Sequence, residues 1–406
     1  MIKVYRNISQ LLTLESAHRK DGRKLLPEDL SIINNGAIVF NDKIILWVGK
    51  ESELPDEYKK EKSTNLAGKV LTPALVDSHT HIIFAGNRAN EYVDKLNGVD
   101  YQVIANKGGG ILYTMDQTLK LSREQLFALG KNRIETLISY GVKTIEIKSG
   151  YGLTFDKEKE ISHVIYDLKK YFESKNVFIF NTYLAAHAVP KSFSSSSDYL
   201  NIVVLPLLEE LARDGIVDAV DIFHEKGYFS SEDVETLFTQ ASRLKIHCKI
   251  HADEFNDNKG AVIASKYKAL SADHLLCTED DGIAALAQSN TVATLLPGTG
   301  FFLGKKQANA RKFLDQGVKV ALASDYNPGS CHCDNLLLLA SISAPQYKMN
   351  LAETWCAITL NASHALGLKN QGALIKNFDA KFAVFDCENI SEITYNWGKN
   401  LLNPNF

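Results

Sequence analysis

The chain has 406 residues, of which 45% are hydrophobic and 23% charged, and its formal net charge at pH 7 is −3. These values are ordinary for a globular protein with a large core, and they indicate neither a nucleic-acid partner nor a membrane partner. The sequence has no apolar run long enough to span a bilayer and no signal-peptide pattern, and its six cysteines form no disulfide framework, so we expect a cytoplasmic protein.

Both ends of the chain have the pattern of short strands and turns. Residues 36–49 are typical of a β-hairpin with Asn41-Asp42 at its turn, and residues 379–386 are typical of a strand. We expect the two ends, residues 1–72 and 372–406, to pair in one small β-domain.

Between these ends, residues 73–371 alternate between strand and helix patterns, which indicates a parallel sheet. The expected strands are residues 70–77, 143–147, 177–182, 219–223, 245–250, 269–272, 292–296 and 319–323, and the main expected helices are residues 123–140, 157–172, 199–213, 231–243, 259–266, 279–288 and 306–316. Eight strand units can close a (β/α)8 TIM barrel, so the sequence predicts an α/β fold of that type. An open doubly wound sheet is the alternative.

Two histidines one residue apart, His79 and His81, follow the first barrel strand. Alternate side chains of a strand point to the same face, so both imidazoles can reach one metal ion. A His-x-His pair on its own is more often structural than metal-binding. Its position favours the metal, because the carboxyl ends of barrel strands are where barrel enzymes place their chemistry.

Polar residues stand at the ends of most of the other expected strands. They are Lys148 to Gly152, His187, His224 and Glu225, His251 to Glu254, Asp273 and His274, and Ser324 to Ser330. In a barrel all these ends face the same opening. Any one of these residues can be structural, but so many at strand ends indicate an active site.

A catalytic metal site needs three or four nitrogen or oxygen ligands and a position for water. His79, His81 and His251 can supply imidazoles, and Asp325 can supply a carboxylate. Such a site lowers the pKa of bound water to about 7 and makes a hydroxide nucleophile available. Imidazole and carboxylate ligands suit zinc and iron equally, so the sequence does not choose between the two metals.

Proton transfer and carbonyl activation need further groups. Glu254 can act as general base and acid, and His274 can polarise a substrate carbonyl. Asp325 can share in proton transfer as well as bind the metal. The alternative for Glu254 is a solvated loop carboxylate, and that for Asp325 is a turn residue.

A second metal would need a bridging lysine on the fourth strand, as in some barrel hydrolases. Lys226 lies beyond that strand, and Lys148 belongs to the second unit. The sequence therefore favours a single metal ion.

Arg88 follows the first strand and can hold a carboxylate with a fork of two hydrogen bonds. Tyr151 can add a hydroxyl donor. The alternative is that Arg88 only pairs with Glu91 or Asp94. The glycines at 108–110 lack the Lys-Ser/Thr of a phosphate loop, and we expect them in a loop near the opening.

Seven stretches together resemble the amidohydrolase superfamily and, within it, the imidazolonepropionase family. They are Asp77-Ser-His-Thr-His81 with Gly86-Asn-Arg88, Lys148-Ser-Gly-Tyr-Gly-Leu153, Tyr183-Leu-Ala-Ala-His-Ala-Val-Pro190, Lys249-Ile-His-Ala-Asp-Glu254, Ser271-Ala-Asp-His274, Leu296-Pro-Gly-Thr299 and Ser324-Asp-Tyr-Asn-Pro-Gly-Ser330. The resemblance extends over nearly the whole chain, and the stretches around Tyr151 and Asp325 are the most specific.

This resemblance implies a barrel beside a β-sandwich domain, a homodimer, and one zinc or iron ion on His79, His81, His251 and Asp325. It implies hydrolysis of the lactam C–N bond of 4-imidazolone-5-propanoate, an anionic imidazolone, to N-formimino-glutamate in histidine degradation. It also implies that substrate or product is held by Arg88, Tyr151, His187, Glu254, Asn327, Gly329 and Ser330. Some members have glutamine in place of Glu254, and many have a smaller residue or a thiol in place of His224.

Two other functions are compatible with the same barrel. One is an aminohydrolase that deaminates a purine or pyrimidine, although a neutral base offers no carboxylate to Arg88. The other is a binding protein without catalytic activity. Such a protein would have no need of the complete set His79, His81, His251, His274 and Asp325.

Overall fold

A computed structural model describes residues 1–99 and 109–406 of the protein. Among the described helices, none combines the length and the apolar character that a membrane span requires. The glycine run at 108–110 is only partly covered, because residue 108 lies outside the described residues.

Eight parallel strands form the larger sheet, in the sequential order expected of a barrel. They are β6 (Leu75–Asp77), β7 (Val142–Lys148), β8 (Phe178–Ala186), β9 (Ala219–His224), β10 (His247–Ala252), β11 (Ser271–His274), β12 (Val292–Leu295) and β13 (Val320–Leu322). Each corresponds to one of the eight expected strands, although the first of these, residues 70–77, is divided between two sheets.

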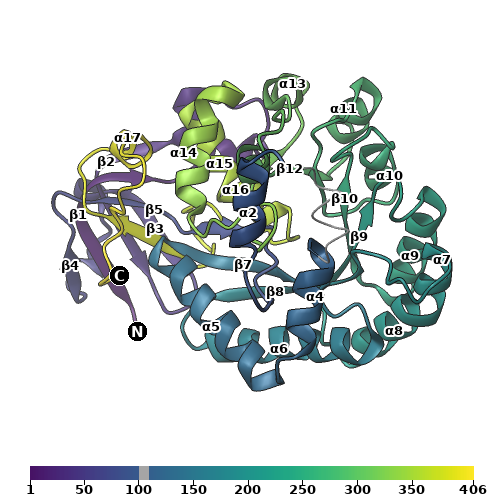
Figure 1. Ribbon diagram of the computed structural model, residues 1–406. Coiled ribbons are helices and arrows are strands. Elements are labelled where there is room, and N and C mark those ends of the chain that lie inside the picture. The colour runs from purple at the N-terminus through teal and green to yellow at the C-terminus, as the bar shows by residue number, and fades with distance from the viewer. Residues whose placement is uncertain (100–108) are drawn as a thin grey trace.

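Helices surround this sheet (Figure 1). Those that follow barrel strands are α2 (Ala89–Leu96), α4 (Ile111–Leu119), α5 (Arg123–Ser139), α6 (Phe155–Glu173), α7 (Ser196–Tyr199), α8 (Leu205–Arg213), α9 (Ser231–Leu244), α10 (Gly260–Lys266), α11 (Asp280–Ala287), α12 (Pro297–Leu303), α13 (Ala310–Asp315), α14 (Leu336–Tyr347), α15 (Leu351–Ala357) and α16 (Leu360–His364). A π-helical turn, Leu200–Val204, joins α7 to α8. The helix expected at 199–213 is therefore built from three segments.

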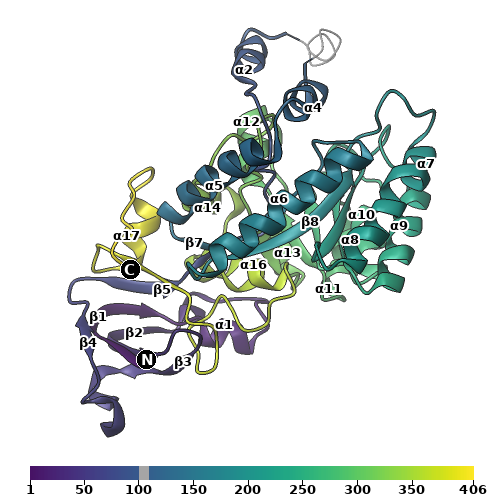
Figure 2. The same cartoon turned by 90° about the horizontal axis from the view of Figure 1, so that it is seen from below.

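The ends of the chain form a second, six-stranded sheet. Its strands are β1 (Lys3–Leu12), β2 (Ile32–Phe40), β3 (Ile45–Lys50), β4 (Ser63–Asn65), β5 (Val70–Pro73) and β14 (Phe382–Phe385), and its short helices are α1 (Glu15–Arg19), α17 (Ile390–Tyr395) and the 3₁₀ turns Pro27–Leu30, Glu51–Glu53 and Asp56–Tyr58. Both termini lie at this sheet, and α2 and α4 project from the barrel on the side away from it (Figure 2).

The predicted fold class was a (β/α)8 barrel with a smaller β-sandwich domain from both chain ends. The barrel and a separate β-domain from both chain ends are confirmed, and the described strands of that domain form one six-stranded sheet. The hairpin expected at 36–49 is β2 paired antiparallel with β3, and β14 pairs antiparallel with β5. The strand expected at 70–77 is two strands, because β5 belongs to the small sheet and β6 to the barrel. The domain boundaries at 72/73 and 371/372 stay a prediction.

Strand β7 shows how the barrel positions its polar groups. Ile145 and Ile147 join the hydrophobic core that also contains Leu168 of α6. The alternate residues, Glu146 and Lys148, contact charged residues of other barrel strands and are fully buried. One face of the strand therefore packs on the helices, and the other carries buried charges inside the barrel.

The barrel closes where β6 meets β13, beyond the ends of both strands. Thr80 forms a parallel bridge with Tyr326. The backbone N–H of Asp325 donates to the carbonyl of His79 at 3.0 Å, and that of His81 donates to the carbonyl of Tyr326 at 2.9 Å. The segments that carry three predicted metal ligands are thus joined by backbone hydrogen bonds.

Side-chain caps fix where several barrel helices begin. The side chains of Ser122, Thr154 and Ser230 accept hydrogen bonds from backbone N–H groups in the first turns of α5, α6 and α9. Such caps satisfy donors that have no partner within the helix, and each stabilises its helix by about 1 kcal/mol.

Candidate metal centre and active site

The predicted site residues meet at the carboxyl ends of the barrel strands. A cavity of about 850 Å³ opens there, and its lining contains every one of them except His79. His79 lies beneath the cavity and is fully buried. The cavity lining includes His81, Arg88, Tyr151, His187, His251, Glu254, His274, Asp325, Asn327, Gly329 and Ser330.

Four predicted ligand side chains converge at the cavity floor. The Nε2 atom of His81 lies 3.1 Å from Nε2 of His79 and 3.4 Å from Nε2 of His251. The Oδ1 atom of Asp325 lies 3.5 Å from Nε2 of His79 and 3.6 Å from Nε2 of His81. Tetrahedral ligands about 2.1 Å from a zinc ion stand about 3.4 Å apart, so this donor set fits one such ion.

The other ring nitrogens of two ligands face carboxylates. Nδ1 of His79 lies 2.7 Å from Oδ2 of Asp273, and Nδ1 of His251 lies 3.1 Å from Oδ2 of Asp221. Burial lowers the pKa of His79 and keeps its ring neutral. A neutral ring that donates through Nδ1 presents its Nε2 lone pair to the centre, which is the tautomer that a metal needs.

Lys148 joins these two carboxylates beneath the site. Its Nζ atom lies 2.6 Å from Asp221, 2.9 Å from Glu146 and 3.7 Å from Asp273, and all four side chains are fully buried. Burial alone would lower the pKa of Lys148, but the three carboxylates raise it above its usual value. The ammonium group is therefore charged throughout the working pH range.

A second group of possible ligands does not make a second metal site. His79, Glu146 and Asp273 lie close enough together to hold an ion. However, Lys249 lies 3.1 Å from Glu146 and 3.8 Å from Asp273, and Lys148 approaches the same two carboxylates. These ammonium groups already neutralise the acids, which agrees with the prediction of a single ion.

Asp325 is held by both its backbone and its side chain. Its φ angle of 51° lies in the left-handed region, where few residues other than glycine, asparagine and aspartate are found. The hydroxyl of Thr299, on α12, donates to Oδ2, so Oδ1 faces the histidines. Burial raises the pKa of Asp325 to about 6, against the lowering effect of Thr299.

Glu254 and His274 lie beside each other at the edge of the cluster. Oε2 of Glu254 is 3.7 Å from Nε2 of His274. Burial, followed by the charges of Asp325 and Glu225, raises the pKa of Glu254 to about 8. Burial lowers the pKa of His274, so this ring is neutral. The pair combines a carboxyl group of high proton affinity with a neutral imidazole, which suits proton transfer and carbonyl polarisation.

Arg88 lies against the turn that follows β13. Its Nε donates to Glu91 at 2.8 Å, so the pairing considered as an alternative does occur. Among the described residues, neither of its terminal nitrogens has a hydrogen-bond partner. A Cβ atom on Gly329 would lie only 1.9 Å from Nη1 of Arg88, and Lys95 donates to the Gly329 carbonyl at 3.3 Å. Arg88 and Lys95 therefore bring two positive charges to the wall at Gly329, and Glu91 pairs with Arg88 there.

The turn itself is organised by Asn327. Its Oδ1 accepts the backbone N–H groups of Gly329 and Ser330, both at 2.8 Å, and its Nδ2 donates to the Asp325 carbonyl at 2.6 Å. The side chain of Asn327 thus connects the metal end of the cavity to the arginine wall. Its bonds are mostly internal, which favours a positioning role.

Two further rings, His187 and Tyr151, line the cavity beside the ligand His81. His187 stacks on His81 with an interplanar angle of 22° and a centroid distance of 5.2 Å. Its Nδ1 lies 3.1 Å from the Gly150 carbonyl, and burial lowers its pKa to about 3. Tyr151 is buried next to both histidines. His224 does not line the cavity and instead contacts Ser231 at 3.2 Å.

Several functional residues received no role in the sequence prediction, although Asp273 was noted there at a strand end. Asp221, Asp273, Glu146 and Lys249 support the ligands, and Thr299 orients Asp325. Charged residues in the middle of apolar strands are the signal that could have revealed the first four, because a buried strand rarely carries them without partners.

Comparison with known proteins agrees with this geometry. The model of the amidohydrolase family matches residues 70–403. The imidazolonepropionase of a Bacillus cereus strain is 40% identical over 401 residues, which cover 98% of this chain and 93% of that protein. That of a Bacillus mycoides strain is 39% identical with the same coverage.

Solved structures share the fold at low sequence identity. Guanine deaminase from C. acetobutylicum has a TM-score of 0.70 and 17% identity, with 99% of this chain and 97% of that chain covered. Atrazine chlorohydrolase from Arthrobacter aurescens TC1, complexed with zinc, has a TM-score of 0.70 and 13% identity, with coverage of 96% and 88%. From the family match and the full-length relatives, the chain belongs to the amidohydrolase family and, within it, to the imidazolonepropionase family.

Proposed function

We propose that this protein hydrolyses the lactam C–N bond of 4-imidazolone-5-propanoate and releases N-formimino-L-glutamate. The observation that carries the proposal is one cavity with a metal-ligand cluster at its floor and Arg88 at its wall. The full-length similarity to imidazolonepropionases supports the same reaction. The cluster fits the ring carbonyl, and the arginine fits the propanoate carboxylate.

We propose His79, His81, His251 and Asp325 as the ligands of one zinc or iron ion. When bound, such an ion supplies a Lewis acid for the ring carbonyl and lowers the pKa of water. Asp273 forms a hydrogen bond with Nδ1 of His79 and fixes its tautomer, and Asp221 faces Nδ1 of His251 at 3.1 Å. The zinc in the atrazine chlorohydrolase structure favours zinc as the first metal to test.

The remaining residues divide between proton transfer and binding. Glu254 would take a proton from the attacking water and return it to the ring nitrogen that leaves, and His274 would donate a hydrogen bond to the carbonyl oxygen. Arg88 would hold the propanoate with its two terminal nitrogens, and Tyr151 and Ser330 would add hydroxyl donors. His187 would stack beside the ring, and Gly329 would leave room for Arg88.

A direct assay tests the proposal. Metal-loaded protein is mixed with 4-imidazolone-5-propanoate, and loss of the ultraviolet absorbance of the conjugated ring is followed. We expect complete ring opening, which a chelator prevents. No turnover by protein of verified metal content would refute the proposal, and ammonia release from guanine or cytosine would indicate a deaminase.

The homodimer also belongs to the proposal, because the resemblance of the sequence suggests it. Light scattering coupled to size-exclusion chromatography measures the mass directly. A mass of one 45.1 kDa chain at micromolar concentration would contradict it.

A further inference from the structure

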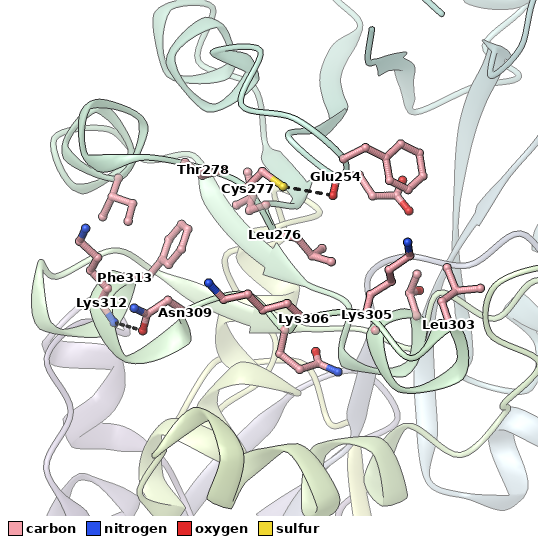
Figure 3. A pocket seen from close by; sticks show the side chains of 16 residues that line it. Glu254, Leu276, Cys277, Thr278, Leu303, Lys305, Lys306, Asn309, Lys312 and Phe313 are labelled. Atoms are coloured by element: carbon pink, nitrogen blue, oxygen red, sulfur yellow. Dashed lines mark hydrogen bonds between the residues drawn. The ribbon is translucent and has the colours of Figure 1, made fainter. Parts of the chain in front are cut away.

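A second cavity of about 600 Å³ adjoins the catalytic cavity. The two share Glu254, Phe255, Leu303 and Lys305 in their linings, so they meet at the residue that we propose as the base. We call the second one the side cavity. It lies between the loop after β11 and the connection from α12 to α13, as Figure 3 shows.

Lysines dominate the charge of the side cavity. Figure 3 shows Lys305 extending toward Glu254, whereas Lys306 extends the other way, toward the end of the cavity near Asn309 and Phe313. Lys312 also lines the cavity, but it pairs with Asp280. Lys305 and Lys306 form no ion pair with any carboxylate in residues 1–99 and 109–406. The side cavity therefore presents two uncompensated cations beside the catalytic cavity.

The reaction proposed above changes the number of carboxylates in its ligand, and the next step rests on that proposed function. Water adds across the ring C–N bond: its oxygen joins the carbonyl carbon, and the nitrogen takes a proton. The new acid then ionises. The substrate thus has one carboxylate, whereas the product has two.

The second carboxylate forms at the metal end of the cavity. Arg88 holds the first one, and the carbonyl carbon that becomes the second lies at the metal-ligand cluster, near Glu254 in the cavity lining. Lys305 lines the same cavity at the Glu254 edge, and Lys306 lies just beyond it.

We propose that the side cavity is a subsite for the newly formed α-carboxylate of the product, which Lys305 binds at the Glu254 edge while Lys306 adds positive potential from farther inside. This subsite selects dicarboxylates over monocarboxylates. Thr278 and Asn309 add polar groups to its wall, and Leu303 and Phe313 add apolar ones.

The test uses two ligands that differ only at the α-carboxylate. N-formyl-L-glutamate has both carboxylates, and its α-amide, N-formyl-L-isoglutamine, has only the side-chain carboxylate. Calorimetric titration of metal-loaded protein measures the affinity of each ligand. The variants are Lys305→Gln/Lys306→Gln and, as the matched control, Lys60→Gln/Lys62→Gln, which removes two exposed lysines near the small sheet.

We expect the side-cavity double variant to bind N-formyl-L-glutamate about tenfold more weakly, while its affinity for the α-amide changes less than twofold. The control variant should match the wild type with both ligands. An equal loss for both ligands would mean a general effect of charge, and no loss would mean that the lysines do not bind the product; either result overturns the subsite.

The outcome is separable from that of the ring-opening assay. A wild-type protein that fails to open the imidazolone ring refutes the proposed function. If it still binds N-formyl-L-glutamate in preference to the α-amide, and loses that preference in Lys305→Gln/Lys306→Gln, the dicarboxylate subsite stands without it.

Discussion

At the scale of single residues, Arg88 separates the proposed substrate from a neutral base. Truncation of Arg88 to alanine removes a fork of charge-assisted hydrogen bonds, each worth about 1.5–3 kcal/mol. We expect Arg88→Ala to raise KM for the imidazolone by roughly 10- to 100-fold, because the carboxylate loses its partner. Steady-state kinetics measure KM, and metal analysis of the same sample provides the control. Loss of the metal would show that Arg88 is structural.

Substitution of Lys148 tests whether the buried charges beneath the metal ligands contribute to metal affinity. Its ammonium group holds Asp221 and Asp273, which in turn orient His251 and His79. Loss of such supporting contacts typically weakens metal binding about 10- to 100-fold. We therefore expect Lys148→Met to bind zinc more weakly by a factor in that range, as measured by competition with a chelating dye.

Lys148→Arg and the surface variant Lys60→Met are the controls for this measurement. The arginine keeps the positive charge and should restore part of the affinity, whereas Lys60→Met should bind zinc as the wild type does. A Lys148→Met protein with wild-type zinc affinity and a native circular dichroism spectrum would contradict the positioning role.

Glu254 links the site to pH. Its pKa is raised by burial to about 8 in the folded protein, whereas a glutamate in an unfolded chain titrates near about 4.3. Between these values the folded state retains a proton that the unfolded state has lost. The corresponding stability is present below about pH 4 and is lost as the pH rises through about 8.

We therefore expect Glu254→Gln to reduce the fall in thermal midpoint of the metal-free protein between pH 5 and pH 8, because glutamine does not titrate. Scanning calorimetry of both proteins across this range measures the difference. Parallel curves would mean that Glu254 titrates normally in the folded state.

At the scale of elements, the turn after β13 packs closely against the segment before α2. A Cβ on Gly329 would lie 1.9 Å from Nη1 of Arg88. We expect Gly329→Ala to displace the guanidinium and to raise KM at least tenfold, while metal content stays unchanged. Pro328→Ala, next to it, is the control. Equal KM values for wild type and Gly329→Ala would show that Arg88 moves aside at no cost.

The positions of the barrel strands could be predicted from the sequence because each is a short apolar run between breakers. The run 70–77 was predicted as one strand, and hydrophobicity could not reveal that β5 and β6 belong to different sheets. Helix α12 was missed because its Pro297-Gly-Thr-Gly start is typical of a turn, although proline is well suited to a first helical turn.

The candidate site was predictable to the extent that its residues follow strands. His79, His81, His251 and Asp325 were found in this way, and the structure brings them together. Buried charges within strands, such as Asp221, were not found. The sequence does not identify the partners of Asp221, because they come from other strands.

At the scale of the whole molecule, a bound metal should stabilise the fold. An ion that binds only the folded state adds about 2.7 kcal/mol at a free concentration of 100 times its Kd. We expect a chelator to lower the thermal midpoint by several degrees and added zinc to restore it, as followed by scanning calorimetry. His79→Asn should show a smaller difference between the two conditions. If the chelator leaves the thermal midpoint of the wild type unchanged, the proposed metal site is contradicted.

The way the barrel closes indicates which part of the fold should lose stability first when the metal is removed. Strands β6 and β13 are the first and the last of the sheet, and past their ends they meet through the Thr80–Tyr326 bridge. His79 and His81 lie on one side of this seam, and Asp325 lies on the other. An ion bound by all three residues would link the two edge strands of the barrel across this seam. Its removal should therefore speed amide hydrogen exchange at His81 and Asp325 first, before the distant sheet of the chain ends responds.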